Sequence, residues 1–146
     1  MTAMPAARSA RAPWRSLLGI VFIAHGVITL AAAVVLAMLP AAIPATVGIE
    51  LGPDGYLLSY FLAAAELAIG VLSLGAARLT DPTAVGLIVA TFVVFHLATA
   101  LLELVFLFSA APSAVLVGNL VVRLVAAVVF VVAWRFWRRR AASASA

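Results

Sequence analysis

The chain has 146 residues, of which 67% are apolar and only 10% are charged, against roughly 45–50% and about 25% in an average soluble domain. So little charge cannot cover a surface that faces water, which excludes an ordinary soluble domain and leaves the lipid bilayer as the solvent. The lack of cysteine excludes disulfides, thiolate metal sites, iron–sulfur clusters and cysteine nucleophiles, and the formal charge of +4 comes from arginines that form no aromatic-interleaved patch for nucleic acid.

Long apolar runs predict four membrane-spanning helices in a single membrane domain. Strands of a membrane barrel would be about half as long and would alternate in polarity, a pattern that is absent here. The runs end at prolines, at arginines or beside the Asp81-Pro82 pair, and only the connection from Pro40 to Tyr56 is long. In chain order the expected spans are about 16–39, 57–77, 85–108 and 115–134, with flexible tails at 1–13 and 141–146.

The arginines predict which way these spans point. With four spans, both termini and the second connection lie on one side of the membrane, and these segments hold eight of the nine arginines. The other side holds Glu50 and Asp54 and no basic residue. The positive-inside rule therefore predicts an all-α, multi-pass four-helix bundle of the cytoplasmic membrane with both termini in the cytoplasm.

Six His, Glu, Asn or Arg residues fall within the predicted spans. A charged group near the bilayer centre costs at least about 2.5–3.5 kcal/mol on insertion scales, so such side chains face the interior of a bundle and pair with one another. The six residues are His25, Glu66, His96, Glu103, Asn119 and Arg123.

Helical spacing arranges these residues in one stripe per helix: His25 and Thr29 share a face of the first span, and Ser59, Glu66, Gly70 and Ser73 share a face of the second. His96, Thr99 and Glu103 stand at i, i+3 and i+7, and Asn119 and Arg123 stand at i and i+4. The stripes predict a four-helix bundle with a polar seam, by which we mean these five residues together with His25 and Glu66.

The depth of each group follows from a rise of 1.5 Å per residue, counted from the membrane boundary beside the long connection. Four of the six groups lie above the membrane midplane on that side, and the two histidines lie just past it. We therefore expect the polar seam to open toward the long connection and to end near the two histidines. The estimates are about 6 Å for Asn119, about 8 Å for Glu103, about 12 Å for Arg123, about 14 Å for Glu66, about 18 Å for His96 and about 21 Å for His25.

Two carboxyl groups face one guanidinium in this polar seam. If both were ionised beside neutral histidines, the seam would carry net negative charge in a low dielectric, so either one Glu carries a proton or a His takes one up. We therefore expect Glu66, His96 and Glu103 to be the catalytic or proton-transferring groups. The expected ligand-binding residues are Arg123, whose fork can hold a carboxylate, and Asn119, His25 and Thr99.

A purely structural interpretation stays open, because polar side chains also serve as interhelical glue and a Glu–Arg pair can fix which helices are neighbours. His25 alone is compatible with an ordinary bond to a backbone carbonyl or a threonine. No metal site is expected, since the Glu-x-x-His spacing of di-iron bundles is missing. Phosphate loops, nucleophile elbows and HExxH motifs are absent as well.

The layout resembles the DoxX-like group of small bacterial four-helix membrane proteins. The similarity rests on the segment from Arg15 to Gly19 that leads into a span containing Gly26, on Glu66-x-x-x-Gly70 in the second span, and on the Gly75-Ala76-Ala77 that follows. It covers most of the chain in span number and length. The best-known association of this group is with a thiosulfate:quinone oxidoreductase subunit, so the resemblance implies a quinone or a thiol-redox partner.

Three functions are compatible with these patterns. The first is binding of a small amphipathic molecule, such as a quinone or a lipid-like metabolite, with proton transfer by the Glu and His residues. The second is a membrane-embedded isomerase or cyclase that uses a Glu/His acid–base pair on an apolar substrate. The third is a structural accessory subunit that docks a membrane protein partner or a second copy of the chain.

Overall fold

The computed structural model describes residues 15–109 and 113–143, and within these ranges every regular element is helical. The predicted tail at 1–13 and the end of the tail at 144–146 lie outside the described residues. The long helices are α1 (Leu17–Met38), α3 (Tyr56–Ala76), α4 (Pro82–Ser109) and α5 (Ala114–Ser143), and the short ones are α2 (Ala42–Thr46) and the 3₁₀ helix η2 (Pro53–Gly55).

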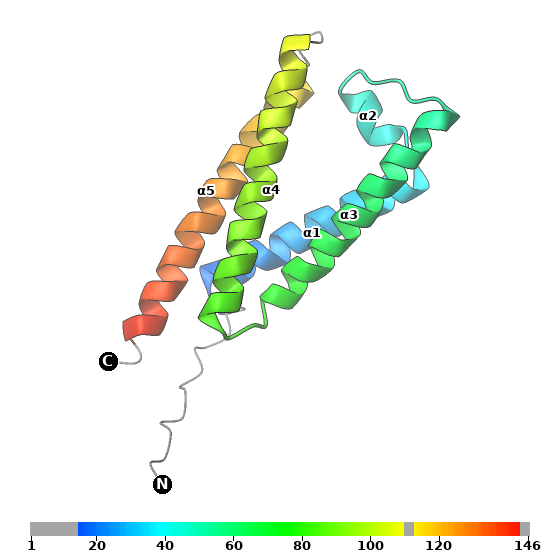
Figure 1. Ribbon diagram of the computed structural model, residues 1–146. Helices are drawn as coiled ribbons and strands as arrows, with labels where there is room; N and C mark the ends of the chain where they lie inside the picture. The colour runs from blue at the N-terminus through cyan, green and yellow to red at the C-terminus, as the bar shows by residue number, and fades with distance from the viewer. Residues whose placement is uncertain (1–14, 110–112, 144–146) are drawn as a thin grey trace.

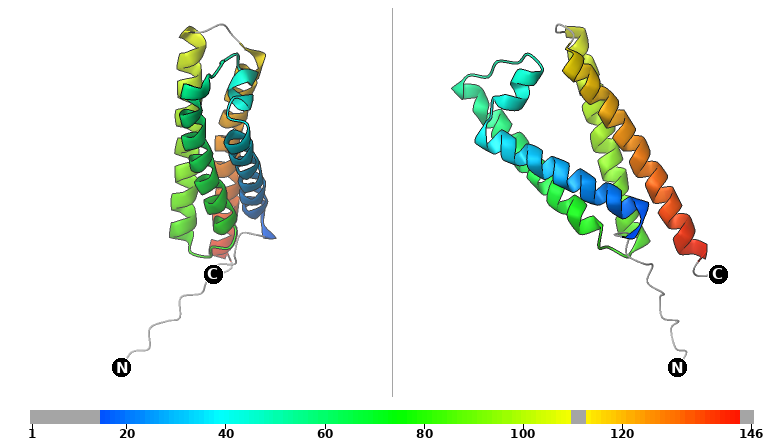
Figure 2. Two further views of the ribbon diagram at one scale, coloured as in Figure 1. Left: turned by 90° about the vertical axis from the view of Figure 1, so that its right-hand side faces the viewer. Right: turned by 180° about the vertical axis from the view of Figure 1, so that it is seen from behind.

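The four long helices form two antiparallel hairpins (Figure 1). One hairpin pairs α1 with α3 and the other pairs α4 with α5, while α1 also contacts α5 between them. The hairpins converge at the end where α1 begins and α5 ends, and they diverge toward the end that carries α2 (Figures 1 and 2). We call the first the arginine end and the second the loop end.

All four long helices are long and apolar enough to cross a membrane, which confirms the prediction of an all-helical chain with four helices of membrane-spanning length and composition. The first three agree with the predicted ranges to within a few residues. The fourth differs, because α5 continues nine residues past Trp134 to Ser143. Its 30 residues correspond to about 45 Å, so it exceeds a hydrocarbon core of about 30 Å and carries its arginines beyond the apolar stretch.

Local sequence explains where the helices begin. The Ser16 side chain caps α1 by accepting a hydrogen bond from the backbone N–H of Gly19. Asp81 precedes Pro82, the first residue of α4, and its carboxylate accepts from the backbone N–H groups of Thr83 and Ala84 at 3.1 Å each. A carboxylate before an N-terminal proline satisfies donors that the first helical turn leaves unpaired.

Two glycines allow α1 and α3 to pack closely. A Cβ built on Gly70 would lie 2.6 Å from Leu30 Cγ, and one built on Gly26 would lie 2.8 Å from the Leu74 side chain and 3.1 Å from the Gly70 carbonyl oxygen. Small residues at such positions let helix backbones approach each other inside a membrane. This contact fixes the α1–α3 hairpin, which positions His25 and Glu66.

The buried core joins the two hairpins near the arginine end. It contains a cluster of three fully buried rings, with Phe22 and Phe92 edge to face at 6.2 Å between centroids and Phe130 within 5.7 Å of both. The other buried members are Leu18, Ala76, Ala77, Val85, Val89, Ala133 and Trp137. Because all four long helices contribute residues to this core, it holds the two hairpins together on the arginine-end side of the polar seam.

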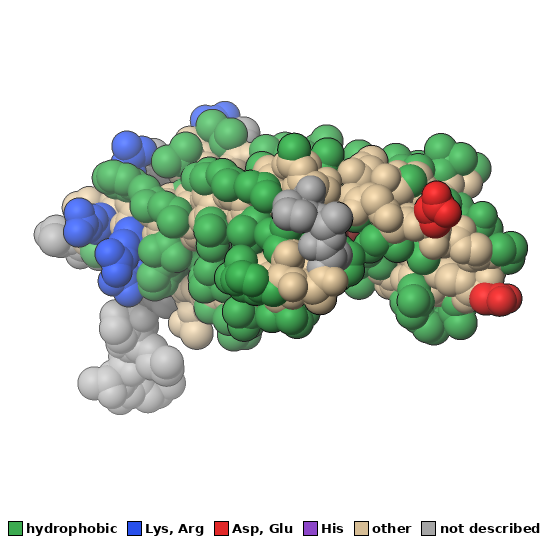
Figure 3. Space-filling model, turned by 90° about the horizontal axis from the view of Figure 1, so that it is seen from above, with side chains coloured by type: hydrophobic (Ala, Val, Ile, Leu, Met, Phe, Trp, Pro, Cys, Tyr) green, Lys and Arg blue, Asp and Glu red, His purple; other side chains and the backbone are tan. Residues whose placement is uncertain are grey.

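Most exposed charged side chains are separated by sign, with basic groups at one end of the molecule and acidic groups at the other (Figure 3). Glu50 and Asp54 are exposed at the loop end. The apolar side chains between the two ends are widely exposed, as expected for surfaces that face lipid. At the arginine end the exposed basic residues are Arg15, Arg78, Arg135, Arg138, Arg139 and Arg140.

Candidate functional site

An ion pair joins the two helices of the α4–α5 hairpin. Arg123 Nε donates to Glu103 Oε1 at 2.7 Å, and the side chains are 25% and 15% exposed. The Arg123 guanidinium carbon also lies 5.9 Å from the centroid of the Phe95 ring. The structure thus selects Glu103 as the ion-pair partner of Arg123, a choice that the sequence left open.

The other carboxyl of the polar seam comes from the opposite hairpin. Glu66 is half-buried on α3, and the guanidinium of Arg123 lies close enough to interact with it electrostatically. Arg123 interacts in the same way with His96. The guanidinium is therefore the one cation shared by the polar groups of both hairpins among the described residues of the seam.

The two histidines meet across the hairpins. His25 Nε2 on α1 and His96 Nε2 on α4 are 3.2 Å apart. On its other side, His25 Nδ1 lies 3.1 Å from Ser73 Oγ on α3, and the Ser73 hydroxyl donates to the backbone oxygen of Phe22 at 2.9 Å. A hydrogen-bonded chain of two imidazoles and a hydroxyl thus connects three helices.

Aromatic rings surround this chain. The His25 ring centroid lies 4.8 Å from that of Phe92 and 5.1 Å from that of Phe130, and His96 stacks on Phe130 at 6.1 Å. His96 is only 7% exposed. The imidazoles therefore lie beside the apolar core on its loop-end side, where a low dielectric strengthens the hydrogen bond between them.

The direction of the hydrogen bonds follows from the serine. Because the Ser73 hydroxyl hydrogen is used on Phe22 O, its oxygen must accept from His25 Nδ1–H. A neutral His25 ring then presents a lone pair at Nε2, which accepts from His96 Nε2–H. His96 is left with a lone pair at Nδ1, and that atom is buried without a partner among the described residues.

We expect nitrogen NMR of membrane-embedded, ¹⁵N-histidine-labelled protein to reveal one ring of each neutral tautomer, since the chain has only two histidines. Ser73→Ala removes the acceptor for His25 Nδ1–H, so the His25 tautomers mix and the scalar coupling between the two Nε2 atoms weakens. Ser59→Ala, which removes a hydroxyl bonded to Pro40 O elsewhere on α3, leaves both signals unchanged. Identical tautomers in the wild type would contradict this hydrogen-bond order.

Several polar groups in this region have unused hydrogen-bonding capacity. Glu103 Oε2, like His96 Nδ1, is buried and without a partner among the described residues. Among the described residues, Arg123 donates a hydrogen bond only from Nε, to Glu103. Unpaired buried polar groups cost about 1–3 kcal/mol each, and such a concentration of them is typical of a site that binds something.

The remaining predicted residues lie at the margin. Thr99 donates to the Phe95 backbone oxygen of its own helix, and Asn119 is exposed on α5, one turn from Arg123 toward the loop end. The hydroxyl of Thr29, near His25, donates to the backbone of α1. The structure thus pairs Glu103 with Arg123 and His25 with His96. Glu66 interacts with the guanidinium only electrostatically, and no hydrogen bond joins His96 to either glutamate among the described residues.

The sequence places the Ser73 hydroxyl on the polar stripe of the second span but assigns it no role in the site, and it does not predict the surrounding rings. Ser73 lies seven residues after Glu66, on the same face of α3, and this spacing was the available signal. Phe92 lies one helical turn before His96, and Phe22 lies about one turn before His25. Among the described residues, no group of three or more His, Asp or Glu side chains is arranged to hold a metal ion.

Comparison with known proteins identifies no relative. No family model matches the chain, and neither a curated protein nor a solved structure is significantly similar to it.

Proposed function

We propose that the chain is a small multi-pass protein of the cytoplasmic membrane that binds an amphipathic small molecule between its two helix hairpins, with proton exchange at the histidine pair. Both termini would lie in the cytoplasm. The positive-inside rule supports this orientation, because the exposed arginines gather at one end of the fold and the acids Glu50 and Asp54 at the other.

The observation that carries the proposal is the unused hydrogen-bonding capacity of Arg123, Glu103 and His96. These groups lie on the loop-end side of the apolar core, where the two hairpins diverge. A pair that served only as interhelical glue would be expected to satisfy its own donors and acceptors. A ligand with a carbonyl or an anionic head and an apolar body supplies the missing partners and matches the surrounding side chains.

Each residue has a distinct chemical task in this proposal. Arg123 holds the carbonyl or anionic group of the ligand through its free N–H groups, with Asn119 beside it nearer the loop end. Glu66 and Glu103 balance the charge of the guanidinium and supply acceptors. A quinone fits these requirements, since it offers two carbonyls and an apolar tail.

The histidine pair supplies the proton chemistry. His96 Nδ1 can accept a proton while His96 Nε2–H keeps its hydrogen bond to His25, so one proton can be taken up without breaking the contact between the hairpins. Ser73 is a positioning residue here, because its bond to His25 decides which nitrogen of each ring carries the hydrogen.

Native mass spectrometry with solvent extraction, on protein purified in mild detergent, tests the proposal. We expect the wild type to retain one small molecule per chain and Arg123→Gln to lose it. Arg135→Gln, the same change on the same helix outside the apolar stretch, should retain it. Asn119→Leu should weaken retention of the small molecule. This variant should fold like the wild type, because Asn119 is exposed.

The outcomes also separate the competing functions. Extraction of a quinone or another unmodified amphiphile supports a binding protein. Extraction of a substrate together with its isomer or cyclised product, at a ratio that changes in His96→Gln, supports the membrane isomerase or cyclase. A wild type that retains nothing, with variants that merely unfold, would reject the ligand site and favour a structural accessory subunit.

A further inference from the structure

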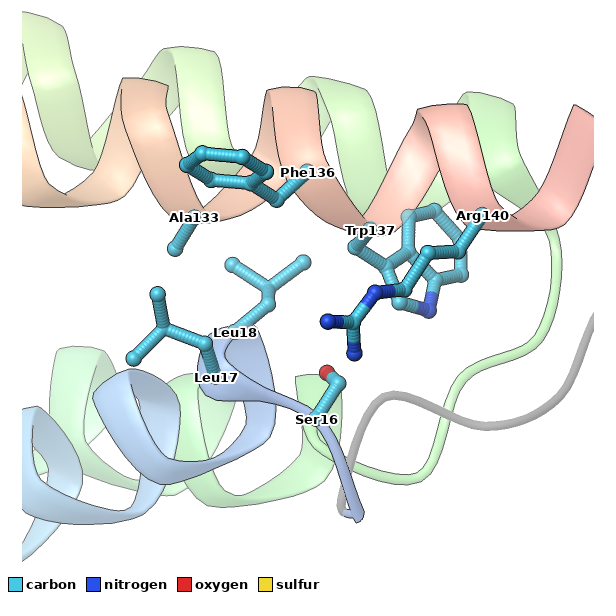
Figure 4. Close-up of a pocket in the computed structure, with 7 residues that line it drawn as sticks. All are labelled: Ser16, Leu17, Leu18, Ala133, Phe136, Trp137 and Arg140. Carbon is cyan, nitrogen blue, oxygen red and sulfur yellow. The ribbon is translucent and has the colours of Figure 1, made fainter.

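A second feature suited to ligand binding lies at the arginine end, far along the helices from Arg123. It is a cavity of about 260 Å³ between the start of α1 and the last turns of α5 (Figure 4). Its lining residues are Ser16, Leu17, Leu18, Ala133, Phe136, Trp137 and Arg140.

This cavity has an apolar wall and a cationic rim. Leu17 and Phe136 are each about half exposed beside it. In Figure 4 the Arg140 side chain reaches from α5 across the cavity toward Ser16 at the start of α1. The start of α1 also presents the positive end of a helix dipole, which favours an anion at that place.

The surrounding charge strengthens this preference. Arg15, Arg138 and Arg139 are exposed at the same end, and Arg138 stacks at 4.7 Å over the Trp134 ring. The described acid at this end is Asp81, whose two carboxylate oxygens both accept from the first turn of α4. No ion pair neutralises Arg140 within the part of the chain that the structure describes.

The position along the helices specifies the kind of anion. The cavity lies where the apolar stretches of α1 and α5 give way to arginines, which is the level of lipid phosphates in a bilayer. Its volume is below the roughly 300–1,000 Å³ of sites that enclose a drug-sized ligand. It therefore suits only a phosphate and the first carbons of a chain whose remainder lies in the membrane.

We propose that this cavity binds one anionic phospholipid, with the phosphate on Arg140 and the adjoining carbons against Leu17 and Phe136. The site is independent of the polar seam, so either could exist without the other. Basic pockets between membrane helices are established places for anionic head groups, and the six arginines of this end disfavour the ammonium of a zwitterionic lipid.

Native mass spectrometry during titration with phosphatidylglycerol or phosphatidylcholine tests the site. We expect the wild type to bind one phosphatidylglycerol in preference to phosphatidylcholine, and Arg140→Gln to weaken that first binding about fivefold, the change that corresponds to about 1 kcal/mol for one basic residue at a charged membrane surface. Arg139→Gln, an adjacent change that does not touch the cavity, should leave it within about twofold, as the same loss of charge acts only at a distance.

Two further arms make the result decisive. Leu17→Trp fills the cavity from its exposed rim and should abolish the preference while the helix content stays unchanged. Inorganic phosphate or glycerophosphoglycerol, which lack acyl chains, should not compete at millimolar concentration. Equal losses in Arg139→Gln and Arg140→Gln would indicate diffuse attraction and overturn the site, and effective competition by free phosphate would overturn its assignment to a lipid.

Discussion

Replacing Arg123 by leucine should lower the free energy of unfolding by about 2–3 kcal/mol, somewhat below the 3–5 kcal/mol typical of a fully buried broken pair because both side chains keep some exposure. The loss arises because Glu103 Oε1 forfeits its 2.7 Å partner while Oε2 is already unpaired among the described residues. Unfolding of the protein in mixed micelles, followed by the loss of helical circular dichroism, measures the change.

The double variant Glu103→Leu/Arg123→Leu should regain most of that stability, since it removes both charges from the apolar region and leaves side chains of similar volume. Arg135→Leu serves as the control and should change stability by less than about 0.5 kcal/mol, as expected for an exposed position. If the single and double variants were equally unstable, the pair would not be the source of the effect.

Replacing Gly70 by alanine should cost about 1–3 kcal/mol, the usual range for overpacking a tight contact. The new Cβ would fall 2.6 Å from Leu30 Cγ and 2.9 Å from Thr29 Oγ1, so these side chains, and α1 with them, must shift away from α3. The same displacement should lengthen the His25–Ser73 bond and mix the histidine tautomers. Micelle unfolding and nitrogen NMR on the same sample check both effects.

Gly75→Ala provides a matched control. Gly75 lies on the same helix as Gly70, and a Cβ built on it would meet nothing within 4 Å. We expect this variant to be as stable as the wild type or slightly more stable, since alanine is the better helix former by about 1 kcal/mol. A Gly70→Ala protein as stable as Gly75→Ala would contradict close packing of α1 on α3.

The four spans could be predicted because the bilayer imposes long apolar runs, and such runs are directly visible in a sequence. The end of α5 could not be predicted, because Arg135 and its neighbours indicate the end of an apolar run and not the end of the helix. Arginine is a good helix former, and its long side chain can reach polar surroundings while the backbone stays helical. The helix therefore continues to Ser143.

Depth arithmetic predicted part of the site. It placed His25 and His96 at nearly the same level, and their Nε2 atoms do meet. It could not choose between Glu66 and Glu103 for Arg123, because the order of helices around a bundle is not encoded in depth. The short connection between α4 and α5 makes them hairpin neighbours, and this brings Glu103 to the guanidinium. Ser73 was visible on the stripe of α3, but its role depends on a contact with another helix.

Ligand retention by the Glu103→Leu/Arg123→Leu protein is the most direct test of the intramembrane binding site, because it separates binding from folding. We expect a helical, stably folded double variant that yields no small molecule on extraction, while wild type and Arg135→Leu each yield one molecule per chain. A folded double variant that retains the same molecule as the wild type would contradict a site built on Arg123 and Glu103.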